Sequence, residues 1–293
     1  MFEHTQPESA NPSRVVVVGA TGVIGKALLA GLQAADVATL GLGSRDLDLA
    51  TAGASESLSK TLRESDAVVI LSALTPDKGR GVATFMKNLA MAQTVCDALH
   101  ARPVSHIVYM SSDAVYPMTN GLVNEETAAQ PPDLYGTMHY AREMMFRDAA
   151  GSTPLAILRC TLVLSANDTH NSYGPNRFRR LAQEKGEIAL GGEGEENRDH
   201  IADVDVAEFV RRVLVHRSKG VINLATGRSS TFRDVAELVA DCCTPKPVIK
   251  GSQRNNPITH RHFDVTALHR AFPEFVFTAL PDAIRRVAAE EGR

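Results

Sequence analysis

The sequence predicts an α/β fold, in which a parallel sheet carries helices on both faces and a smaller α/β lobe follows toward the C-terminus. Short apolar runs, often β-branched, alternate with longer stretches whose apolar residues recur at helical spacing. Parallel strands need a crossover between them, usually a helix, so this alternation indicates a doubly wound parallel sheet. Beyond residue 165, loop-forming residues become frequent, which predicts a change of architecture.

The first half of the chain supplies the strands and helices of this sheet in turn. Residues 14–18 read RVVVV and are followed by glycine, which is typical of a strand buried on both faces. The first helix is predicted at 22–32. The further elements, in order, are a strand at 37–42, a helical stretch at 58–64, a strand at 67–72, a long helix at 82–100, a strand at 105–111, a helix at 135–150 and a strand at 155–164.

The second half has shorter elements. Residues 166–177 are rich in Asn, Asp, Gly and Pro and predict a loop, and residues 188–197 contain a Gly- and Glu-rich turn. The regular elements predicted there are strands at 221–224 and 248–250 and helices at 230–239 and 280–290. The domain organisation that we expect is a flexible N-terminal tail at 1–13, a nucleotide-binding domain at 14–165, and a lobe formed mainly by 166–293, with 205–225 returning to the first domain.

Composition and charge exclude several classes of protein. The 293 residues are 44% hydrophobic, with a formal net charge of −3 and no basic block, which argues against nucleic acid as a partner. No apolar run reaches the roughly 18 residues of a membrane span. The polar N-terminus does not read as a signal peptide, and the four cysteines make neither a zinc pattern nor a disulfide framework. We therefore expect a cytoplasmic protein with reduced thiols, no membrane contact and no metal site.

The turn between the first strand and the first helix has the pattern of a nucleotide site. It reads Gly-Ala-Thr-Gly-Val-Ile-Gly over residues 19–25. Gly19 allows a tight turn, Gly22 lets the backbone approach a pyrophosphate at the helix N-terminus, and Gly25 allows close packing of helix on strand. A glycine-rich turn without a ligand is the alternative. With the strand before it, the pattern favours a Rossmann-type dinucleotide site that includes Gly19, Thr21, Gly22, Val23, Ile24 and Gly25.

Two serines lie where the strand at 105–111 ends, in a segment that reads MSSDAVYP over residues 110–117. This segment resembles the Ser-Ser-x-x-Val-Tyr-Gly motif of the extended short-chain dehydrogenases/reductases, the NAD-dependent epimerase/dehydratase family, with Pro117 in place of the usual glycine. Tyr135 follows at a spacing similar to that of the family. The resemblance implies that Ser112 polarises a substrate carbonyl or hydroxyl group.

Tyr135 and His139 resemble the Tyr-x-x-x-Lys catalytic pair of that family, with histidine in place of lysine. Residues i and i+4 of a helix share a face, so both can face one cofactor. The resemblance implies that Tyr135 exchanges a proton with the substrate oxygen and that His139 orients the ribose. A lysine would lower the pKa of Tyr135, whereas a histidine with an ordinary pKa near 6.5 is mostly neutral at pH 7, which suits carbonyl reduction better than alcohol oxidation. A degenerate pair in a protein that binds nucleotide without turnover is the alternative.

The end of the second strand bears on the choice of cofactor. A carboxylate there would bind the ribose 2′-hydroxyl of NAD, but none stands at the tip, and Arg45 could bind the 2′-phosphate of NADP. This favours NADP; an unpaired loop arginine, or Asp46 or Asp48 as the ribose partner in NAD, is the alternative. In some sugar ketoreductases a stretch similar to Asp48-Leu49 lies beneath the adenine. The cofactor residues expected outside the glycine turn are Ser44, Arg45, Asp48, Leu49, Ser72, Ala73, Tyr135 and His139.

Further matches extend the resemblance over about residues 14–290. Residues 158–160 are similar to the family's Leu-Arg-Pro segment, 173–175 to its Tyr-Gly-Pro substrate loop, and 198–200 to its Arg-Asp-aromatic segment. In nucleotide-sugar enzymes of the family, the arginine of the last segment contacts the diphosphate, and a second arginine does so from a position similar to Arg261. A surface ion pair is the alternative for both. The substrate-binding residues implied are Ser112, Asn176, Arg177, Arg198 and Arg261.

These matches predict an NAD(P)-dependent oxidoreductase that acts on a nucleotide sugar and, among such enzymes, a keto-sugar reductase with Tyr135 as proton donor. The alternative within the family is a nucleotide-sugar epimerase that retains its NAD. The alternative of another class is a non-catalytic NAD(P)-binding or sensing protein on the same fold. Relatives often dimerise through the two long helices that correspond to 82–100 and 135–150, so a homodimer is the expected assembly.

Overall fold

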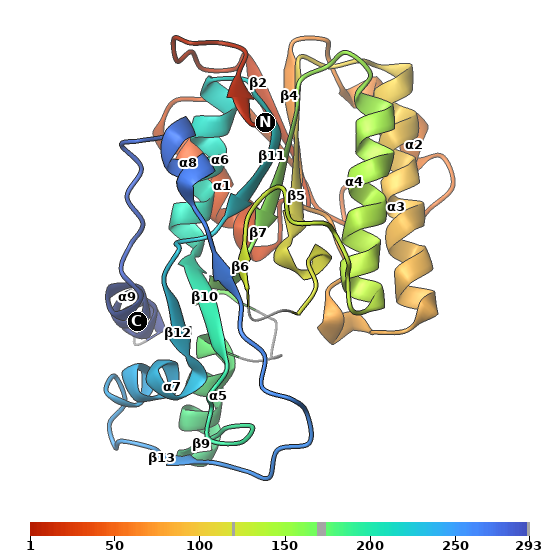
Figure 1. The fold of residues 1–293 in the computed structure, drawn as a ribbon. Coiled ribbons are helices and arrows are strands. Elements are labelled where there is room, and N and C mark those ends of the chain that lie inside the picture. Colours follow the sequence, from red (N-terminus) through yellow and green to blue (C-terminus); the bar gives the residue numbers. More distant parts are fainter. Residues whose placement is uncertain (119–120, 169–173, 292–293) are drawn as a thin grey trace.

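A seven-stranded sheet forms the centre of the molecule in the computed structural model, which describes residues 1–118, 121–168 and 174–291 (Figure 1). The strand order is β1-β11-β7-β5-β4-β2-β3, and all neighbouring pairs are parallel except β1 with β11. The strands are β1 (Glu3–His4), β2 (Arg14–Val18), β3 (Thr39–Leu42), β4 (Asp66–Ile70), β5 (His106–Ser112), β7 (Leu155–Cys160) and β11 (Ser218–Leu224).

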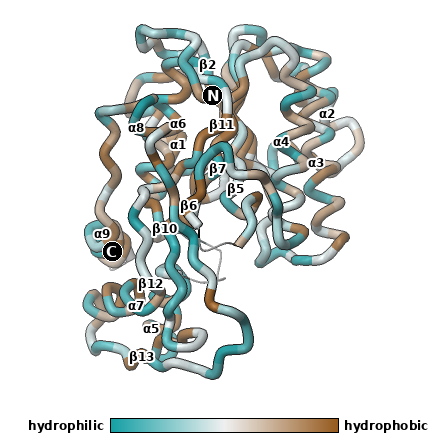
Figure 2. The backbone as a smooth tube through the Cα atoms, viewed as in Figure 1, coloured by the Kyte–Doolittle hydropathy of each residue, from teal (hydrophilic) through white to brown (hydrophobic). Residues whose placement is uncertain are grey.

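Helices cover both faces of this sheet, as Figure 1 shows. The helices on one face are α1 (Val23–Ala34), α6 (Asp203–Val215) and α8 (Thr266–Ala271), and those on the other are α2 (Ala54–Thr61), α3 (Val82–Ala101) and α4 (Leu134–Ala150). Side chains alternate along a strand, so Val15 and Val17 pack on the first layer and Val16 and Val18 on the second. The hydrophobic stretches of the central strands lie between the two layers (Figure 2). The predicted fold class is confirmed.

The strand order reverses between β2 and β4. The chain passes from β2 outward to β3 on one side and then to β4, β5 and β7 on the other. In open α/β sheets, ligands bind in the crevice at the carboxyl ends of the strands where the order reverses. The loops that follow β2, β3, β4 and β5 all end at that edge, and they carry the residues predicted to bind cofactor and substrate.

The strand predicted at 155–164 is in fact two strands in two different sheets. β7 lies in the central sheet, whereas β8 (Leu162–Leu164) pairs with β10 (Asn197–Ala202), which in turn pairs with β12 (Ser229–Thr231). Thr161 lies at the break, where its backbone N–H donates to Leu224 O (3.1 Å) and its hydroxyl to Asp199 O (3.0 Å). The mainly apolar sequence of residues 155–164 does not reveal such a change of partner, because both halves have strand-forming residues.

Two helices differ from the sequence-based prediction. The helix predicted at 58–64 lies at α2, residues 54–61, and ends before the strand-like Leu62. Residues 166–177 are not all loop, since α5 (Pro175–Lys185) begins at Pro175 and ends before Gly186, which has φ +63°. Proline in the first turn and a left-handed glycine after the last are ordinary helix boundary signals. The sequence of α5 is mostly polar, so its apolar face is hard to recognise. Phe178 and Ala182 form this face and pack in the core of the lobe.

The N-terminal tail predicted at 1–13 is not wholly without structure. Glu3 and His4 pair with Lys219 and Ser218 to form β1 at the edge of the sheet. The His4 ring hydrogen-bonds through Nδ1 to the Ser218 hydroxyl (2.8 Å) and through Nε2 to Ala271 O (2.9 Å). The physical reason is that β11 is an edge strand with unpaired backbone groups, which a short segment can satisfy even when its own sequence is polar.

The lobe lies below the carboxyl edge of the sheet (Figure 1). Its helices α5, α7 (Phe232–Ala240) and α9 (Leu280–Glu291) enclose a core of their own, and β9 (Glu187–Ala189) pairs with β13 (Val248–Lys250). The remaining elements are η1 (Pro76–Lys78), η2 (Asp113–Val115), β6 (Leu122–Val123) and β14 (His262–Phe263), the last two paired with each other. In the part of the chain that the structure describes, no helix combines the length and apolar character needed to cross a bilayer.

The start of α4 lies unusually close to η2. A Cβ atom added to Gly136 would stand 2.0 Å from Ala114 O and 2.8 Å from a side-chain carbon of Pro131. Asp133 caps the same turn, since its carboxylate accepts a hydrogen bond from the Gly136 N–H (2.9 Å). Only glycine therefore allows the helix that carries Tyr135 to rest against the segment that follows Ser112.

Replacing Gly136 with alanine should push α4 and η2 apart. We expect a loss of roughly 1–3 kcal/mol in the free energy of unfolding, the usual range for overpacking, because backbone rather than a flexible side chain stands in the way. Urea unfolding monitored by circular dichroism measures it. Gly31→Ala in α1 is the matched control, since nothing lies within 4 Å of its added Cβ, and it should be neutral or stabilising. Equal stability of the two variants would contradict the close approach.

The stability of the protein should fall as the pH drops from about 6.5 to about 4. Burial lowers the pKa of His106 to about 4, of His139 to about 3 and of His200 to about 4. In the unfolded chain these histidines become protonated near pH 6.5, whereas in the folded protein they stay neutral to lower pH. Their contribution to the free energy of unfolding is therefore complete above about pH 6.5 and is lost as the pH falls toward their folded pKa values. Asp199 acts in the opposite sense, because burial raises its pKa to about 6, and it offsets part of the effect.

Urea unfolding between pH 7.5 and 4.5 tests this dependence. Each histidine that is neutral in the fold contributes a slope of about 1.4 kcal/mol per pH unit across its window. His106→Gln should reduce the slope by about one proton, since the amide can replace the hydrogen bond from Nε2 to Ser218 O (2.7 Å) and does not titrate. Identical slopes for wild type and variant would show that His106 is not neutral in the folded protein.

Candidate active site

The glycine turn after β2 is shaped to receive a phosphate group. Gly19 has φ +96°, and a Cβ there would stand 2.7 Å from Ser72 N, while a Cβ on Gly25 would stand 2.6 Å from Gly19 O. α1 begins after Gly22 without a side-chain cap and without an acidic residue in its first turn. Thr21 and Gly22 are exposed. The N–H groups at the start of α1 therefore face outward at the positive end of the helix dipole, where an anion is stabilised.

The tip of β3 lies beside this turn. Gly43 approaches Thr21 so closely that a Cβ on it would stand 2.6 Å from the Thr21 methyl group. The Asp46 carboxylate accepts a hydrogen bond from the Gly43 N–H (2.8 Å), so it closes the turn at the strand end. Ser44 and Arg45 are exposed there, and so is Asp48, whereas Leu49 is buried in the core beneath. The predicted adenosine-binding residues thus gather at one corner of the sheet.

The segment after β4 faces the glycine turn from the other side. Ser72 is partly buried, and its hydroxyl is a buried polar atom without a hydrogen-bond partner. The next residues, Ala73 and Leu74, are held by Asn88 of α3, whose amide accepts from Leu74 N (2.8 Å) and donates to Leu74 O (2.9 Å). Asn88 was not predicted to belong to the site. An unsatisfied hydroxyl beside a phosphate cradle fits a bound dinucleotide, which would supply its partner.

The two serines at the end of β5 have different surroundings. Ser111 is buried, and its hydroxyl donates to the Glu143 carboxylate (2.7 Å). Ser112 is only partly buried, and its hydroxyl accepts from Ala114 N (3.1 Å) and has only a long contact to Asp113 (3.5 Å). The first serine is therefore committed to the core, and the second faces the crevice. Burial raises the pKa of the adjacent Asp113, and the charges of Arg261 and Arg198 act against that shift.

Tyr135 and His139 are in contact on one face of α4. Their ring centroids are 4.7 Å apart in an edge-to-face arrangement, with Tyr135 partly exposed and His139 only 3% exposed. His139 Nδ1 shares a hydrogen bond of 2.8 Å with the hydroxyl of Tyr109 on β5. Its Nε2 is buried without a partner. Burial, helped by the nearby charge of Arg142, lowers the pKa of His139 to about 3, so the imidazole is neutral at physiological pH.

A buried polar network connects α4 to strands of the central sheet. Arg159 of β7 forms a bidentate pair with Glu143 of α4, at 2.9 and 2.8 Å, and donates to the Tyr116 hydroxyl (2.9 Å). Tyr116 in turn donates to Asn223 of β11 (2.7 Å). All four residues are at most 5% exposed. The network thus joins α4 to β7, to the Tyr116 segment and to β11 through hydrogen bonds between buried side chains.

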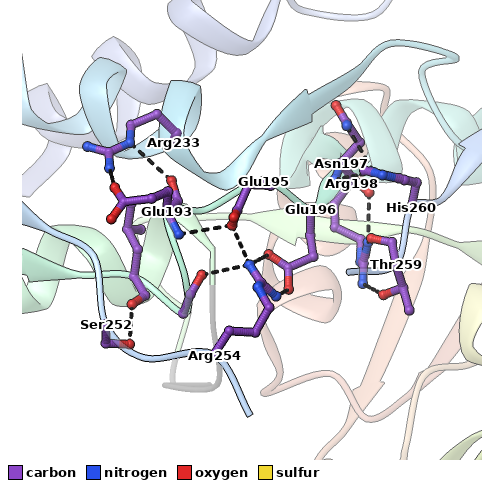
Figure 3. A network of polar contacts seen from close by, with 12 residues as sticks. Glu193, Glu195, Glu196, Asn197, Arg198, Arg233, Ser252, Arg254, Thr259 and His260 are labelled. Atoms are coloured by element: carbon purple, nitrogen blue, oxygen red, sulfur yellow. Dashed lines mark hydrogen bonds and ion pairs between the residues drawn. The ribbon is translucent and has the colours of Figure 1, made fainter. Parts of the chain in front are cut away.

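The lobe contributes Arg198, which lies close to the loop at 251–261 (Figure 3). Its guanidinium donates to Asn197 O (2.8 Å) and Thr259 O (2.7 Å), and a second nitrogen donates to the Thr259 hydroxyl (2.8 Å). Its Cζ lies 5.9 Å from the Phe232 ring centroid. The side chain is partly exposed, so it is held in one position and still accessible. A guanidinium held in this way is suited to an anionic group.

Arg261 and Asn176 have mainly structural contacts. Arg261 is 1% exposed and donates to the backbone carbonyls of Asp113 and Tyr116, so it ties the lobe to the segment after Ser112. Asn176 is 5% exposed, and its amide bonds Ser165 N (3.2 Å) and Val163 O (3.0 Å) at the end of β8. That they also bind substrate stays a prediction. Arg177 is exposed, and Tyr173 of the predicted substrate loop lies outside the described residues.

Sequence reasoning missed several residues that build the site. Tyr109 and Asn88 lie in an ordinary strand and an ordinary helix, and only the fold brings them to His139 and Leu74. Arg142 and Glu143 could have been found from the sequence. They lie seven and eight residues after Tyr135, so they fall on the same face of the helix as Tyr135 and His139, and both are buried. Among the described residues, no group of three or more His, Cys, Asp or Glu side chains is arranged to hold a metal ion.

One known protein family matches most of this chain. Residues 15–225 match the family model described as "NAD dependent epimerase/dehydratase family". A dTDP-L-rhamnose 4-epimerase from Burkholderia thailandensis is 27% identical over 159 residues, which are 48% of this chain and 41% of that protein. The alignment thus spans less than half of that relative.

Solved structures with the same fold extend the likeness over nearly the whole chain. A GDP-L-fucose synthetase from Naegleria fowleri bound to NADP is 18% identical, covers 97% of this chain and 96% of its own, and has a TM-score of 0.84. MoeE5 in complex with UDP-glucuronic acid and NAD is 20% identical, with 95% and 99% coverage and a TM-score of 0.83. The family model covers well over half of the chain and ends one residue after β11, the last strand of the central sheet along the chain. The sequence-based family prediction is therefore confirmed, and this protein belongs to the NAD-dependent epimerase/dehydratase family.

Proposed function

We propose that the protein is an NAD(P)-dependent oxidoreductase that reduces a keto-sugar carried on a nucleotide, with Tyr135 as proton donor. The observation that carries this proposal is the edge-to-face contact of Tyr135 with a buried, neutral His139. A neutral imidazole does not favour the phenolate, so Tyr135 enters the reaction as a phenol. A phenol can give a proton to a carbonyl oxygen, whereas a reaction that begins by oxidising an alcohol needs the phenolate as base.

The chain's own residues account for the rest of the site. Ser112 hydrogen-bonds the carbonyl oxygen from the end of β5, since its neighbour Ser111 is committed to Glu143. In this proposal the Tyr109 hydroxyl, which burial keeps protonated, donates to His139 Nδ1, so that His139 Nε2 carries the imidazole proton. That unpartnered N–H is placed to donate to a ribose hydroxyl. The nicotinamide, when bound, supplies the hydride.

The cofactor fits the crevice at the reversal of strand order. The open N-terminus of α1 and the glycine turn receive the pyrophosphate, and the unsatisfied Ser72 hydroxyl lies beside them. We infer a preference for NADP, because Arg45 is exposed at the tip of β3 and Asp46 is occupied by Gly43 N. The similar fucose synthetase binds NADP and MoeE5 binds NAD, so both forms occur on this fold.

The nucleotide-sugar substrate rests on a different part of the molecule. Arg198 is held by Thr259 at the edge of the lobe and can bind a diphosphate there. MoeE5, which has the same fold, is seen with UDP-glucuronic acid.

We further propose a cytoplasmic homodimer through α3 and α4, whose outer surface exposes Val82, Met86 and Met144. A nucleotide-sugar epimerase with retained NAD is the second candidate, favoured by the sequence match to a rhamnose 4-epimerase.

Three outcomes separate the candidates in purified protein. Turnover of NADPH with a nucleotide-linked keto-sugar identifies a reductase. Cofactor that stays bound through purification, with interconversion of two sugar epimers and no net oxidation, identifies the epimerase. Cofactor binding without turnover of any keto-sugar or nucleotide sugar identifies a sensing protein.

Tyr135→Phe should abolish most of the reductase activity while cofactor binding survives. Losing the proton donor is expected to cost about 10²–10⁴-fold in kcat, the usual contribution of a general acid. Stopped-flow absorbance of NADPH oxidation measures the rate, and fluorescence titration measures cofactor affinity. Tyr140→Phe, in the same helix and packed against Val115 and Tyr116, is the matched control and should keep its activity. A Tyr135→Phe enzyme within tenfold of wild type would refute the assignment.

Arg45→Ala should weaken NADPH binding and leave NADH binding nearly unchanged. A charge-assisted contact to the 2′-phosphate is worth about 1.5–3 kcal/mol, so the dissociation constant for NADPH should rise by roughly one to two orders of magnitude. Fluorescence titration of both cofactors measures this, with the exposed Arg63→Ala as control for general surface charge. A preference for NADH in the wild type that persists in the variant would count against NADP as the cofactor.

A further inference from the structure

Arg142 is a fully buried cation in the helix of the candidate site. It is 0% exposed and lies three residues after His139 and seven after Tyr135, so it shares their face of α4 about one and two turns further along. Its Nη2 donates to Ser72 O (2.7 Å), and its Cζ lies 5.3 Å from the centroid of the Tyr109 ring. The side chain thus runs to the cofactor edge of β4 and beneath the residue that holds His139.

No carboxylate offsets the charge of Arg142 among the described residues. Its other contacts are to Met138 Sδ (3.9 Å) and to the ring of Phe146, whose centroid is 5.7 Å from Cζ, and its Nε has no hydrogen-bond partner. The neighbouring Glu143 is turned to Ser111 and Arg159 instead. An arginine stays protonated even when buried, and a buried charge without a partner is costly to keep. Its position is therefore not explained by packing alone.

Three titratable groups near Arg142 are neutral at physiological pH. Burial raises the pKa of Cys96 on α3 to about 12 and raises that of Tyr109 on β5 above its usual range. Burial lowers the pKa of His139 on α4 to about 3. The charge of Arg142 acts on each of these three groups, favouring the anion in the first two and opposing the cation in the third. Among these four side chains Arg142 is therefore the charged one. Glu143, which also acts on Tyr109, is paired with Arg159, and Asp97 and Asp148, which act on Cys96, are exposed.

We propose that Arg142 is a positioning residue that supplies a fixed positive charge for proton transfer at Tyr135 from about two helical turns away, a weaker influence than a lysine at position 139 would have from one turn away. The inference rests on the proposed function. In the reduction, hydride from the nicotinamide forms the new C–H bond, the Tyr135 O–H bond breaks, and its proton forms the O–H bond of the alcohol. The products are oxidised cofactor and a tyrosinate. A neutral His139 cannot balance that negative charge, whereas a cation one turn further along the same buried face can.

The arrangement divides between two side chains what one lysine does elsewhere. His139 provides the hydrogen bond to the cofactor through Nε2, and Arg142, held by Ser72 and stacked near Tyr109, provides the charge. The same charge opposes protonation of His139 and so keeps the hydrogen-bonding form of the imidazole. Arg142 does not touch the substrate, since it is fully buried, and it acts through the field that it creates at Tyr135.

The direct measurement is the titration of Tyr135 in the full-length protein. With ¹³C-labelled tyrosine, NMR follows each phenol, and Tyr135→Phe assigns the resonance of Tyr135. Arg142→Met should raise the pKa of Tyr135 by about one unit, the lower end of the range for one nearby charge, and should lower kcat for keto-sugar reduction about tenfold. Arg142→Lys should keep both near the wild-type values. Adding His139→Lys to Arg142→Met should bring the pKa back down and restore activity.

Arg147→Met is the matched control. Arg147 lies on the same helix but is exposed, and it is 3.6 Å from Glu143, so its loss should leave the Tyr135 pKa unchanged. An unchanged Tyr135 pKa in a folded Arg142→Met protein overturns the proposal, and so does a failure of His139→Lys to reverse the change. If both Arg142→Met and Arg142→Gln fail to fold while Arg142→Lys folds and is inactive, Arg142 is structural and the proposal is wrong.

The titration also separates this proposal from the function on which it rests. The pKa of Tyr135 is measured without any substrate, so it reports on Arg142 even if the wild type reduces no keto-sugar. If the Tyr135 pKa shifts in Arg142→Met but the wild type has no reductase activity, the proposed reaction is wrong and the electrostatic role of Arg142 stands. Reductase activity that depends on Tyr135 but not on Arg142 would do the reverse.

Discussion

The buried pair of Glu143 and Arg159 is the interaction on which the geometry of the site depends. It joins α4 to the central strand β7, and through Ser111 and Tyr116 it reaches β5 and the segment after Ser112. Removal of either partner would leave a buried charge uncompensated, at a cost of about 3–5 kcal/mol. Because α4 also carries Tyr135 and His139, the same contacts that place the helix on the sheet also position this pair. Gly136 completes this placement by allowing the helix to touch η2.

Burial, more than residue type, determines which side chains of the site are charged. His139 lies in an environment that favours its neutral form, and its neighbours Tyr109 and Cys96 are likewise neutral. The replacement of lysine by histidine therefore does more than weaken a charge, since it moves the cation away from position 139 altogether. Arg142 remains as the charged group beneath the pair, and its bond to Ser72 O ties it to the strand that lines the cofactor crevice. Hydrogen bonding and charge are thereby assigned to different residues.

Side-chain contacts link the lobe to the segment that follows β5. Arg261 bonds the backbone of Asp113 and Tyr116, while the preceding Thr259 holds Arg198. Nearer the start of the same loop, Arg254 pairs with Glu195 and Glu196, and Arg233 of α7 pairs with the neighbouring Glu193, as Figure 3 shows. The loop at 251–261, mostly hydrophilic in Figure 2, is thus attached at both ends to charged or backbone partners.

The central fold and the cofactor turn could be predicted from sequence because their signals are local. A β-branched run followed by spaced glycines and a helix leaves few alternatives, and the Ser112, Tyr135 and His139 motifs mark the loops that the sheet topology brings to one edge. The break at Thr161, the helix α5 and the strand β1 could not be predicted in the same way. Each depends on a partner distant in sequence, such as β10 or the open edge of β11.

The sequence by itself determined the family, the doubly wound sheet and the positions of the chemically distinctive residues, since these follow from short motifs and apolar periodicity. Only the tertiary structure decided what those residues can do. That His139 is neutral, that Arg142 carries an uncompensated charge, and that Arg261 is tied to backbone carbonyls all follow from burial and from the identity of neighbours. Burial and neighbours are properties of packing between distant segments, and the spacing of residues along the chain does not contain them.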